Sequence, residues 1–353
     1  MDAHADPASD LTVPATDVAP AISVEEAGEV VRQHFGIEGS VSSLPSERDQ
    51  NFLISKTPKG EFVLKVANVK EDILTLEAQN AVLERLQTAD NSLVLPAVCQ
   101  SIHGRMIENV HVPSGTFFMR LVTFVPGTPL GEIQETPSVA FELTGELLAT
   151  FAVALQGFSH PGVPTNFHWD LMHADYVIAK YSTLLSHDQQ ILVDLFAERF
   201  RRNVVPRLSE LSVGVIHNDA NDHNVIIDQD SSNASVALID FGDMVHSCLV
   251  FDPAVAAAYA TFYDDESFAN SKAVIRGYQE TRPLSPLEAS LLGWLVPVRL
   301  CLSGVIGAFQ KKNSPQNEYL DISQKRVWES LETLAAVTAQ DVQTMFCEEL
   351  DEI

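Results

Sequence analysis

Two polar clusters in the second half of the chain combine the residue types that hold a metal ion and orient a hydroxyl group. The first is the segment HNDANDHN at residues 217–224, and the second is IDFGD at residues 239–243. Each adjoins a short apolar run, so its carboxylates and amides are expected at the ends of strands. Oxygen ligands of this kind suit Mg²⁺, and a carboxylate among them can take a proton from an attacking hydroxyl.

The spacing of the two clusters is typical of phosphoryl transfer. His217, Asp219 and Asn224 form a His-x-Asp-x-x-x-x-Asn pattern, and Asp240 follows in an Asp-Phe-Gly triplet. In kinases this pattern supplies an aspartate that positions the hydroxyl, with an asparagine and a second aspartate that hold metal. The alternative is that these side chains are ordinary turn residues, since Asp and Asn are common in turns. Their joint spacing favours the catalytic interpretation.

The first third of the chain is expected to form a small β-rich lobe. Its predicted elements are a helix beginning at Ser23, a hairpin of residues 51–55 and 61–67, a helix at 72–87 and a strand at 117–125. Ser23 and Glu26 have the spacing of a capping box, and Gly36 is expected to end the first helix. The segment PGTP at residues 126–129 is a point where a chain commonly leaves one lobe for another.

The remainder of the chain is predicted to be mainly helical, which makes the fold class α+β. Helices are expected at 138–156, 188–208, 251–263, 267–281, 286–309 and 316–339, with one hairpin of residues 225–228 and 236–239. The predicted divisions are a disordered acidic tail at 1–22, a nucleotide-binding N-lobe at 23–125, a catalytic and substrate-binding C-lobe at 126–340 and an acidic tail at 341–353. A chain of 353 residues is longer than one compact core usually fills.

The catalytic segments resemble the aminoglycoside phosphotransferase and choline kinase superfamily rather than the protein kinases. No Arg stands between His217 and Asp219, and no Ala-Pro-Glu segment follows Asp240. Within that superfamily the chain is similar to the hydroxylysine kinase family, through LPSERDQNF at 44–52, VIHNDANDHN at 215–224 and IDFGDM at 239–244. The resemblance extends over residues 23–340. It implies a protein-kinase-like, two-lobed fold with a small β-rich N-lobe and a larger, mainly helical C-lobe.

The resemblance assigns roles to the matching residues of the C-lobe. It implies that Asp219 is the catalytic base and that Asn224 and Asp240 are ligands of Mg²⁺. His217 is expected to hold the loop through backbone hydrogen bonds, with proton transfer by its ring as the alternative. Asn218 occupies a position where the superfamily often has Gly, and this departure leaves the catalytic positions intact.

In the N-lobe the resemblance places Lys65 at the nucleotide phosphates. A single Lys among alternating apolar residues agrees with this role, while an edge-strand lysine that prevents aggregation is the alternative. Glu77 is the predicted ion-pair partner that orients Lys65, although the nearby acids Glu71, Asp72 and Glu84 offer the same chemistry.

The N-lobe lacks a Gly-x-Gly-x-x-Gly phosphate loop. In its place the segment SERDQN at residues 46–51 joins two predicted strands. Backbone amides of this segment, together with Ser46, Gln50 or Asn51, are predicted to cap the phosphates.

The acceptor is predicted to bind in the C-lobe. Asp222, Asp243 and Asp252 follow the catalytic segments and are candidates for attracting a cationic amine, although Asp222 and its neighbour His223 are equally suited to cap the loop. Arg299 lies inside the apolar run 291–309, where a buried Arg needs an anion. That anion is either the α-carboxylate of a hydroxy amino acid or an internal Asp or Glu.

These residues predict a Mg²⁺-dependent kinase that transfers the γ-phosphoryl group of GTP or ATP to a small amino alcohol or hydroxy amino acid. The resemblance implies 5-hydroxy-L-lysine as acceptor and GTP as donor. The alternatives are a homoserine-, choline- or aminoglycoside-type kinase and a non-catalytic nucleotide-binding module. The intact Asp219, Asn224 and Asp240 argue against the non-catalytic module.

Composition limits the partners of the protein. A net charge of −26, from 22 Lys and Arg against 48 Asp and Glu, argues against nucleic acid and anionic membranes as partners. The four cysteines lack paired spacing, which predicts reduced thiols in the cytoplasm. The run 291–309 contains Pro297 and Arg299 and is expected to be a buried helix rather than a membrane span. The oligomeric state is left open.

Overall fold

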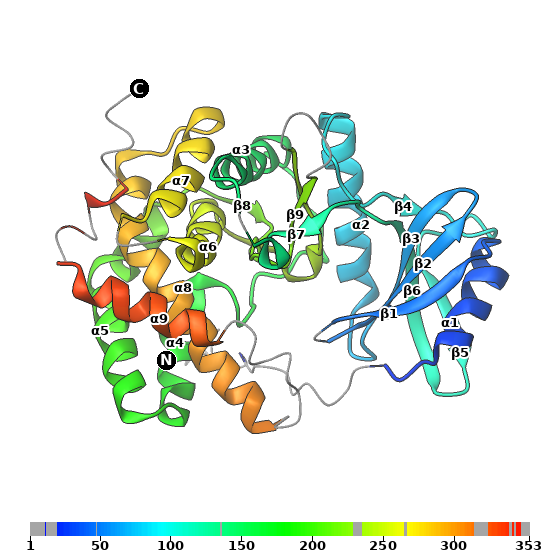
Figure 1. Cartoon of the computed structure of the whole chain (residues 1–353), viewed down its shortest axis with the longest axis horizontal. Helices are drawn as coiled ribbons and strands as arrows, with labels where there is room; N and C mark the ends of the chain where they lie inside the picture. The colour runs from blue at the N-terminus through cyan, green and yellow to red at the C-terminus, as the bar shows by residue number, and fades with distance from the viewer. Residues whose placement is uncertain are drawn as a thin grey trace, which may run out of the picture. The chain divides into compact units, whose positions relative to one another are not determined.

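The computed structural model of the protein is built from two compact units (Figure 1). It describes residues 11, 20–46, 48–134, 136–228, 235–264, 267–313, 324–338, 341 and 344–346. The smaller unit contains the described residues of Ala15–Pro126 together with Ser159–Val163, and the larger contains Gly127–Phe158 and the described residues of Pro164–Ile353. Most of the two predicted acidic tails lies outside the described residues.

The smaller unit is an antiparallel sheet with two helical segments. Its strands are β1 (Ser40–Leu44), β2 (Gln50–Thr57), β3 (Gly60–Val66), β4 (Val98–Cys99), β5 (Glu108–Val112) and β6 (Gly115–Thr123). They are ordered β1-β2-β3-β6-β4, and β5 pairs with β6. The helical segments are α1 (Val24–Val30), which continues as the π-helical turn η1 (Val31–Phe35), and α2 (Ile73–Ala89).

Local sequence determines these elements. Ser23 and Glu26 form the predicted capping box at the start of α1, and Gly36, at a φ of 61°, ends η1 in the left-handed region that glycine tolerates. In β3 the buried side chains alternate with partly exposed ones, so Lys65 lies on the opposite face from Leu64. The register sets Lys65 directly across from Asn51 on β2 and Arg120 on β6.

The larger unit is mainly helical. Its helices are α3 (Val139–Ala154), α4 (Ala174–Tyr181), α5 (His187–Asn203), α6 (Phe251–Ala260), α7 (Ala269–Thr281), α8 (Pro286–Asn313) and α9 (Gln324–Ala336). Short strands interrupt them: β9 (Val225–Asp228) pairs with β10 (Ser235–Leu238) and β7 (Thr128–Pro129), while β8 (Val213–Ile216) pairs with β11 (Val245–Cys248). The smaller unit is built on an antiparallel sheet and the larger unit is mainly helical, which confirms the predicted α+β class.

Helix α8 is the core of the larger unit. It packs against α4, α5, α6 and α9 (Figure 1). It is long and apolar enough to cross a membrane, yet 94% of its most apolar window is buried inside the protein. The same burial holds Arg299 in the interior, with 1% of its surface exposed. The helix therefore serves as a core helix that carries one buried cation.

Candidate active site

The two polar clusters meet at one end of the β9–β10 hairpin. The first cluster connects β8 to β9, and the second follows β10 and forms the 3₁₀ turn η6 (Phe241–Asp243). The backbone N–H of Ile239 donates to the carbonyl of Asn224, at 3.0 Å, immediately beyond the paired residues Val225 and Leu238. Asn224 and Asp240 therefore both lie at this end of the hairpin.

Three side chains hold the carboxylate of Asp219. Its Oδ2 accepts a hydrogen bond from Asn224 Nδ2 at 2.7 Å, and its Oδ1 accepts from Asn221 Nδ2 at 3.0 Å. Arg299 Nη2 lies 3.2 Å from the same Oδ1. These bonds fix the direction of the carboxylate, which is what a base that orients a hydroxyl group requires.

The electrostatic surroundings make Asp219 a stronger base than a free aspartate. Burial and the nearby carboxylate of Asp243 raise the pKa of Asp219 well above its ordinary value, while Arg299 opposes the rise. A cation bound among Asp219, Asp240 and Asp243 would relieve this repulsion.

The donor set beside Asp219 fits a hard divalent cation. Asn224 Nδ2 donates to both the Oδ2 and the carbonyl of Asp219, so the amide oxygen of Asn224 is directed away from Asp219 as a ligand. Asp240 has a φ of 61° and a ψ of 84°, a left-handed conformation that is rare outside glycine and recurs at functional sites. An amide oxygen with carboxylate oxygens is the ligand chemistry of Mg²⁺.

The side chain of His217 contacts the backbone of the catalytic segments on both sides of its ring. Its Nδ1 accepts from the backbone N–H of Asp219 at 3.3 Å, and its Nε2 donates to the carbonyl of Ile239 at 3.1 Å. The ring also packs edge-on against Phe241, with centroids 4.8 Å apart. Both ring nitrogens are engaged with backbone, which favours the predicted positioning role over proton transfer by the ring.

Asp252, predicted as a substrate-binding residue, contacts the backbone of the catalytic loop. It is 3% exposed, and its two oxygens accept the backbone N–H groups of His217 and Asn218 at 3.0 and 2.7 Å. Burial raises its pKa to about 6, although both hydrogen bonds act in the opposite direction. With both oxygens turned to the catalytic loop, Asp252 anchors that loop to the start of α6.

The backbone at Asn218 explains the departure from the superfamily pattern. Asn218 has a φ of 66°, in the left-handed region where Gly is favoured and Asn is the next best tolerated residue. Its Nδ2 donates to the carbonyl of Asp243 at 3.2 Å, which ties the first cluster to the second. Asn218 therefore substitutes for glycine and adds a contact that glycine cannot make.

Arg299 forms the internal ion pair that was one of its two predicted alternatives. Its Nη1 donates to the carbonyl of Trp169 at 2.9 Å, and its guanidinium stacks 4.7 Å from the Trp169 ring centroid and 5.6 Å from that of Tyr259. Its Nη2 contacts Asp219, and its buried Nε has no hydrogen-bond partner among the described residues. A guanidinium enclosed in this way does not support the prediction that Arg299 binds the carboxylate of an acceptor.

Asp222 keeps one carboxylate oxygen available. Its Oδ2 accepts from Tyr263 at 2.8 Å and lies 3.4 Å from Arg326, whereas its buried Oδ1 has no hydrogen-bond partner among the described residues. Asp243 is half-buried. These two carboxylates, unlike Asp252, remain candidates for an amine.

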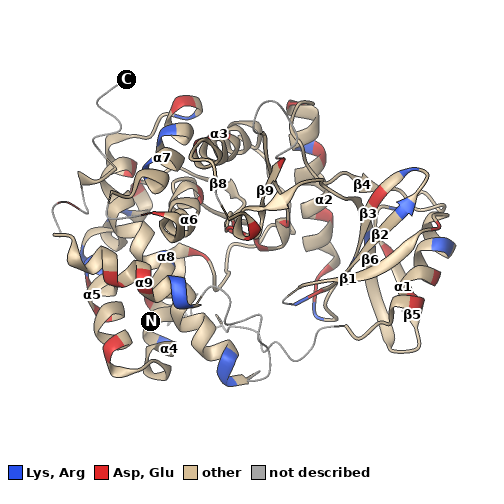
Figure 2. Cartoon of the chain, in the orientation of Figure 1, with Lys and Arg blue, Asp and Glu red and all other residues tan. Residues whose placement is uncertain are grey.

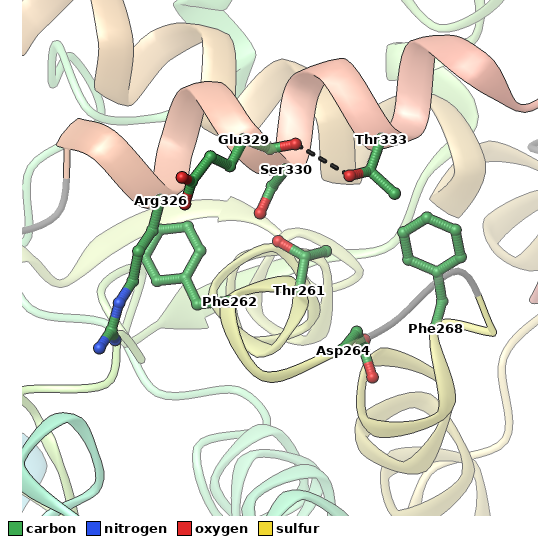
Figure 3. A pocket seen from close by; sticks show the side chains of 8 residues that line it. All are labelled: Thr261, Phe262, Asp264, Phe268, Arg326, Glu329, Ser330 and Thr333. Carbon is green, nitrogen blue, oxygen red and sulfur yellow. Dashed lines mark hydrogen bonds between the residues drawn. The ribbon is translucent and has the colours of Figure 1, made fainter. Parts of the chain in front are cut away.

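A small cavity of about 130 Å³, with Arg326 in its wall, lies between the end of α6, the start of α7 and α9 (Figure 3). It is lined by Thr261, Phe262, Asp264, Phe268, Arg326, Glu329, Ser330 and Thr333. No residue of the two catalytic clusters lines this cavity, so it is separate from the phosphoryl-transfer residues.

Comparison with known proteins identifies the family. The sequence profile of the phosphotransferase enzyme family matches residues 40–287. The chain belongs to this family. It is therefore a phosphotransferase with an alcohol group as acceptor.

Curated relatives of this phosphotransferase are named hydroxylysine kinase. The protein from Xenopus laevis is 28% identical, with 94% of this chain and 95% of the relative covered, and that from Bos taurus is 29% identical, with 93% of each covered. Among solved structures, an aminopropanol kinase matches with a TM-score of 0.69 at 16% identity, covering 93% of this chain and 98% of that chain. A GDP complex of an aminoglycoside 2′-phosphotransferase matches with a TM-score of 0.61 at 16% identity, covering 88% and 99%.

In the smaller unit of the phosphotransferase, Lys65 and Asn51 lie opposite each other on β3 and β2. Asn51 is 8% exposed, and its Oδ1 has no hydrogen-bond partner among the described residues. Arg120, across from Lys65 on the other side, reaches α2 and donates to Asn80 Oδ1 at 2.8 Å and to Gln79. Site roles were predicted from the sequence for Lys65 and Asn51 but not for Arg120, Asn80 or Gln79.

Two further predicted residues of the smaller unit, Gln50 and Glu77, are placed as follows. Gln50 uses both ends of its amide on the backbone of Ile22, at 2.8 Å each, so it fastens the chain before α1 and does not cap phosphates in this structure. Glu77 is exposed on α2 and makes no ion pair with any described residue, because the inward face of the helix is formed by its neighbours such as Leu76 and Gln79. Ser46 is exposed, and its contact with the phosphates stays a prediction.

Sequence reasoning missed Asn221, Trp169, Tyr259, Tyr263 and Arg326. Asn221 carried a signal, because it lies between Asp219 and Asn224 in the first cluster. The others come from distant segments, and only the packing of α6, α8 and α9 brings them near the loop.

Proposed function

We propose that this phosphotransferase transfers the γ-phosphoryl group of GTP or ATP, with Mg²⁺, to the hydroxyl group of a cationic amino alcohol, with 5-hydroxy-L-lysine as first choice. The observation that carries the proposal is the carboxylate of Asp219, aligned by Asn224 and Arg299 beside Asp240. The acceptor rests on the curated relatives, which are named hydroxylysine kinase and align with nearly the whole chain.

Each catalytic side chain has one part in this reaction. Asp219 receives the hydrogen bond of the acceptor hydroxyl and takes its proton as the oxygen attacks the γ-phosphorus. The oxygens of Asn224 and Asp240 would hold Mg²⁺, which neutralises charge on the β- and γ-phosphates. Arg299 balances the charge of Asp219, and Lys65 is assigned to the α- and β-phosphates.

The acceptor amine is assigned to Asp222 and Asp243. Asp222 retains a buried oxygen without a partner among the described residues, and a buried acceptor favours a charged donor. The α-carboxylate of a hydroxy amino acid needs a cation in turn. Arg326, 43% exposed and only loosely held at 3.4 Å from Asp222, is the better candidate for that anion than the enclosed Arg299.

A simple amino alcohol without a carboxylate is the second candidate acceptor. The observation in its favour is the structural likeness to an aminopropanol kinase. Homoserine-, choline- and aminoglycoside-type acceptors remain alternatives within the same chemistry. We propose a cytoplasmic enzyme, consistent with the free thiols of Cys99, Cys248 and Cys301.

Product formation from a panel of donors and acceptors tests the proposal. The purified protein is incubated with Mg-GTP or Mg-ATP and, in turn, 5-hydroxy-L-lysine, L-lysine, 1-amino-2-propanol, choline, homoserine and an aminoglycoside, and nucleoside diphosphate is measured. We expect the largest kcat/KM with 5-hydroxy-L-lysine and none with L-lysine, which lacks the hydroxyl. Absence of acceptor-dependent product throughout the panel would favour a non-catalytic nucleotide-binding module.

A further inference from the structure

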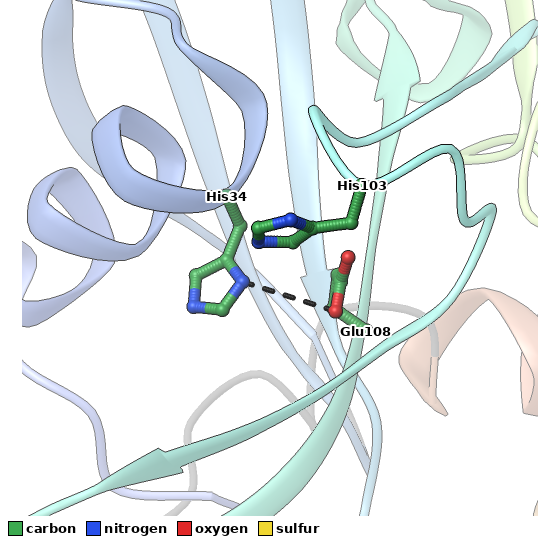
Figure 4. Close-up of side chains that lie close together, drawn as sticks. All are labelled: His34, His103 and Glu108. Carbon is green, nitrogen blue, oxygen red and sulfur yellow. Dashed lines mark ion pairs between the residues drawn. The ribbon is translucent and has the colours of Figure 1, made fainter.

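Two histidines and a buried glutamate converge in the smaller unit, and none of them has a part in the proposed phosphoryl transfer. His34 lies in η1, His103 in the turn that precedes β5, and Glu108 is the first residue of β5 (Figure 4). One ligand atom from each side chain lies within 4.8 Å of the other two. Two stretches that are far apart in the sequence, η1 and the turn with the start of β5, thus present metal-binding groups to one point.

Glu108 is a carboxylate without adequate compensation. Its side chain is 2% exposed, and its Oε1 is buried with no hydrogen-bond partner among the described residues. The Oε2 forms a long ion pair at 3.5 Å with Arg105 Nη1, whose side chain is 60% exposed, and lies 3.8 Å from His34 Nδ1, so neither contact serves the buried Oε1. A buried carboxylate is costly unless a cation and hydrogen bonds stabilise it, so this site calls for a further positive charge.

His34 presents a second unused ligand atom. Its Nδ1 is buried, faces Glu108 and has no hydrogen-bond partner among the described residues. The ring of His103 stands edge-on to that of His34, with centroids 5.9 Å apart (Figure 4). A neutral imidazole nitrogen that no protein donor satisfies is a ready metal ligand.

The backbone fixes the two histidines relative to each other. The N–H of Ile102 donates to the carbonyl of His34 at 2.8 Å, which joins the turn to η1 one residue before His103. The buried Ser101 closes the turn, because its Oγ accepts the N–H groups of His103 and Arg105 at 3.1 and 3.2 Å. The ligands therefore arrive on a tied turn rather than on a free loop, which lowers the entropy cost of binding.

We propose that His34, His103 and Glu108 bind one Zn²⁺ ion, with water at the remaining position. Two imidazoles and one carboxylate are a ligand set of zinc, whereas Mg²⁺ and Ca²⁺ prefer oxygen alone. Ligand atoms of a tetrahedral zinc site are roughly 3.3 Å apart, so small side-chain rotations close the triangle. The side chain of Arg105, 60% exposed, moves to solvent when the ion binds. The ion cross-links η1, the turn and β5 and so stabilises the smaller unit.

Zinc titration of the full-length protein tests the site. The protein is stripped with chelator and titrated with Zn²⁺ by calorimetry in excess Mg²⁺, so that oxygen ligands near Asp240 are occupied. We expect one Zn²⁺ per chain and a higher unfolding temperature when it is bound. His103→Ala, at an exposed side chain that the fold tolerates, should weaken the binding by at least about ten-fold and remove the thermal shift.

His111→Ala is the matched control. His111 is an exposed histidine on β5, the strand that carries Glu108, and its side chain lies outside the cluster, 3.0 Å from Thr116 Oγ1. It should bind Zn²⁺ like the unaltered protein. Glu108→Gln should weaken binding as His103→Ala does. Equal Zn²⁺ affinity of the His103→Ala and His111→Ala proteins, or no saturable binding to the unaltered protein, would overturn the proposal without bearing on phosphoryl transfer.

Discussion

The carboxylate of Asp219 is held between an amide and a buried guanidinium. Asn224 aligns it from one side, and Arg299 reaches it from the middle of α8. Because Asp240 and Asp243 carry charge of the same sign nearby, the cation of Arg299 offsets repulsion that would otherwise displace or protonate the carboxylate of Asp219. Arg299 is thus a positioning residue for Asp219.

Replacing Arg299 with Met, which removes the charge at similar length, is expected to lower kcat by about 100-fold with less than a three-fold change in the KM of the acceptor. The reason is that the guanidinium acts on Asp219 and not on the substrate. Steady-state kinetics with 5-hydroxy-L-lysine and with its decarboxylated amine check this. Arg299→Lys should recover part of kcat.

Arg282→Met is a matched control, since Arg282 makes a comparably enclosed ion pair with Glu288 at 2.9 Å, away from the loop. It should cost stability but leave kcat of the folded enzyme unchanged. A large rise in KM for Arg299→Met, confined to the acceptor that bears a carboxylate, would show instead that Arg299 binds that carboxylate.

Asn218 offers a test of the loop itself. Asn218→Ala places Cβ in a left-handed conformation and removes the bond to the carbonyl of Asp243, so the unfolding free energy should fall by about 2 kcal/mol. Asn218→Gly relieves the backbone and should stay within about 1 kcal/mol of the unaltered protein. Urea unfolding followed by tryptophan fluorescence measures both. Equal losses for Ala and Gly would mean that backbone conformation is not the constraint.

At the scale of single residues, the sequence predicted the groups that form a local pattern. Asp219, Asn224 and Asp240 were found because their spacing along the chain reflects their geometry. Arg299 was recognised as a buried cation, but its partner depends on how α8 packs, and periodicity does not contain that information. The backbone contacts of Asp252 and Gln50 could not be predicted, because an acid or amide that bonds backbone has the same sequence signal as one that bonds substrate.

Helices α3 and α7 pack so closely that a glycine on each helix lies against the backbone of the other. A Cβ at Gly277 would lie 1.9 Å from the carbonyl oxygen of Glu142 on α3, and a Cβ at Gly145 would lie 1.9 Å from that of Val274 on α7. Each glycine thus admits the backbone of the other helix. Backbone cannot move aside as a flexible side chain can, so the two helices cross only where both positions lack a side chain.

Gly277→Ala should therefore lower the unfolding free energy of the larger unit by at least about 2 kcal/mol, because the helices must separate. Gly28→Ala is the control, since a Cβ at this helical glycine would meet Val41 at 3.5 Å, an ordinary contact. Urea unfolding is followed by tryptophan fluorescence for the larger unit, where all three tryptophans lie, and by far-ultraviolet circular dichroism for both units, so that the effect of Gly28→Ala in the smaller unit is measured as well. A midpoint for Gly277→Ala equal to that of Gly28→Ala would contradict this account of the crossing.

Long helices were predicted from sequence more closely than short strands. α2, α3, α7 and α8 begin and end within a few residues of their predicted bounds, because capping residues and apolar periodicity mark them. The β1 strand has no buried side chain, and β4 has only two residues, so neither shows the alternation that identifies a strand. The predicted start of the last helix, at 316, lies outside the described residues.

For the whole molecule, the charge of −26 is the dominant electrostatic feature. Acidic and basic side chains both occur on elements of each unit (Figure 2). A net charge this far from zero opposes compaction through self-repulsion.

Salt should relieve that repulsion. Raising NaCl from about 0.05 M to about 1 M shortens the screening length from more than ten to roughly 3 Å, and we expect the unfolding temperature to rise. Scanning calorimetry measures it, with sucrose at equal osmolality as the uncharged control. A rise in sucrose as large as that in NaCl would attribute the effect to solute exclusion rather than to charge.

The division of the chain into units could be predicted only in part. The boundary between Pro126 and Gly127 falls within the Pro-Gly-Thr-Pro segment, which composition marks. The inclusion of Ser159–Val163 in the smaller unit has no such signal. It depends on Gly162, where a Cβ would lie 1.8 Å from the carbonyl of Leu74 on α2, a contact between segments far apart in sequence.

The most direct test of the central claim is single-turnover phosphoryl transfer by Asp219→Asn, with Mg-GTP or Mg-ATP and the best acceptor of the panel. Asn keeps the shape of the side chain but cannot accept the hydroxyl proton. We predict a fall in the transfer rate of at least about a thousand-fold, with nucleotide affinity within about three-fold of the unaltered enzyme. A rate within ten-fold of the unaltered enzyme would contradict the assignment of Asp219 as the base.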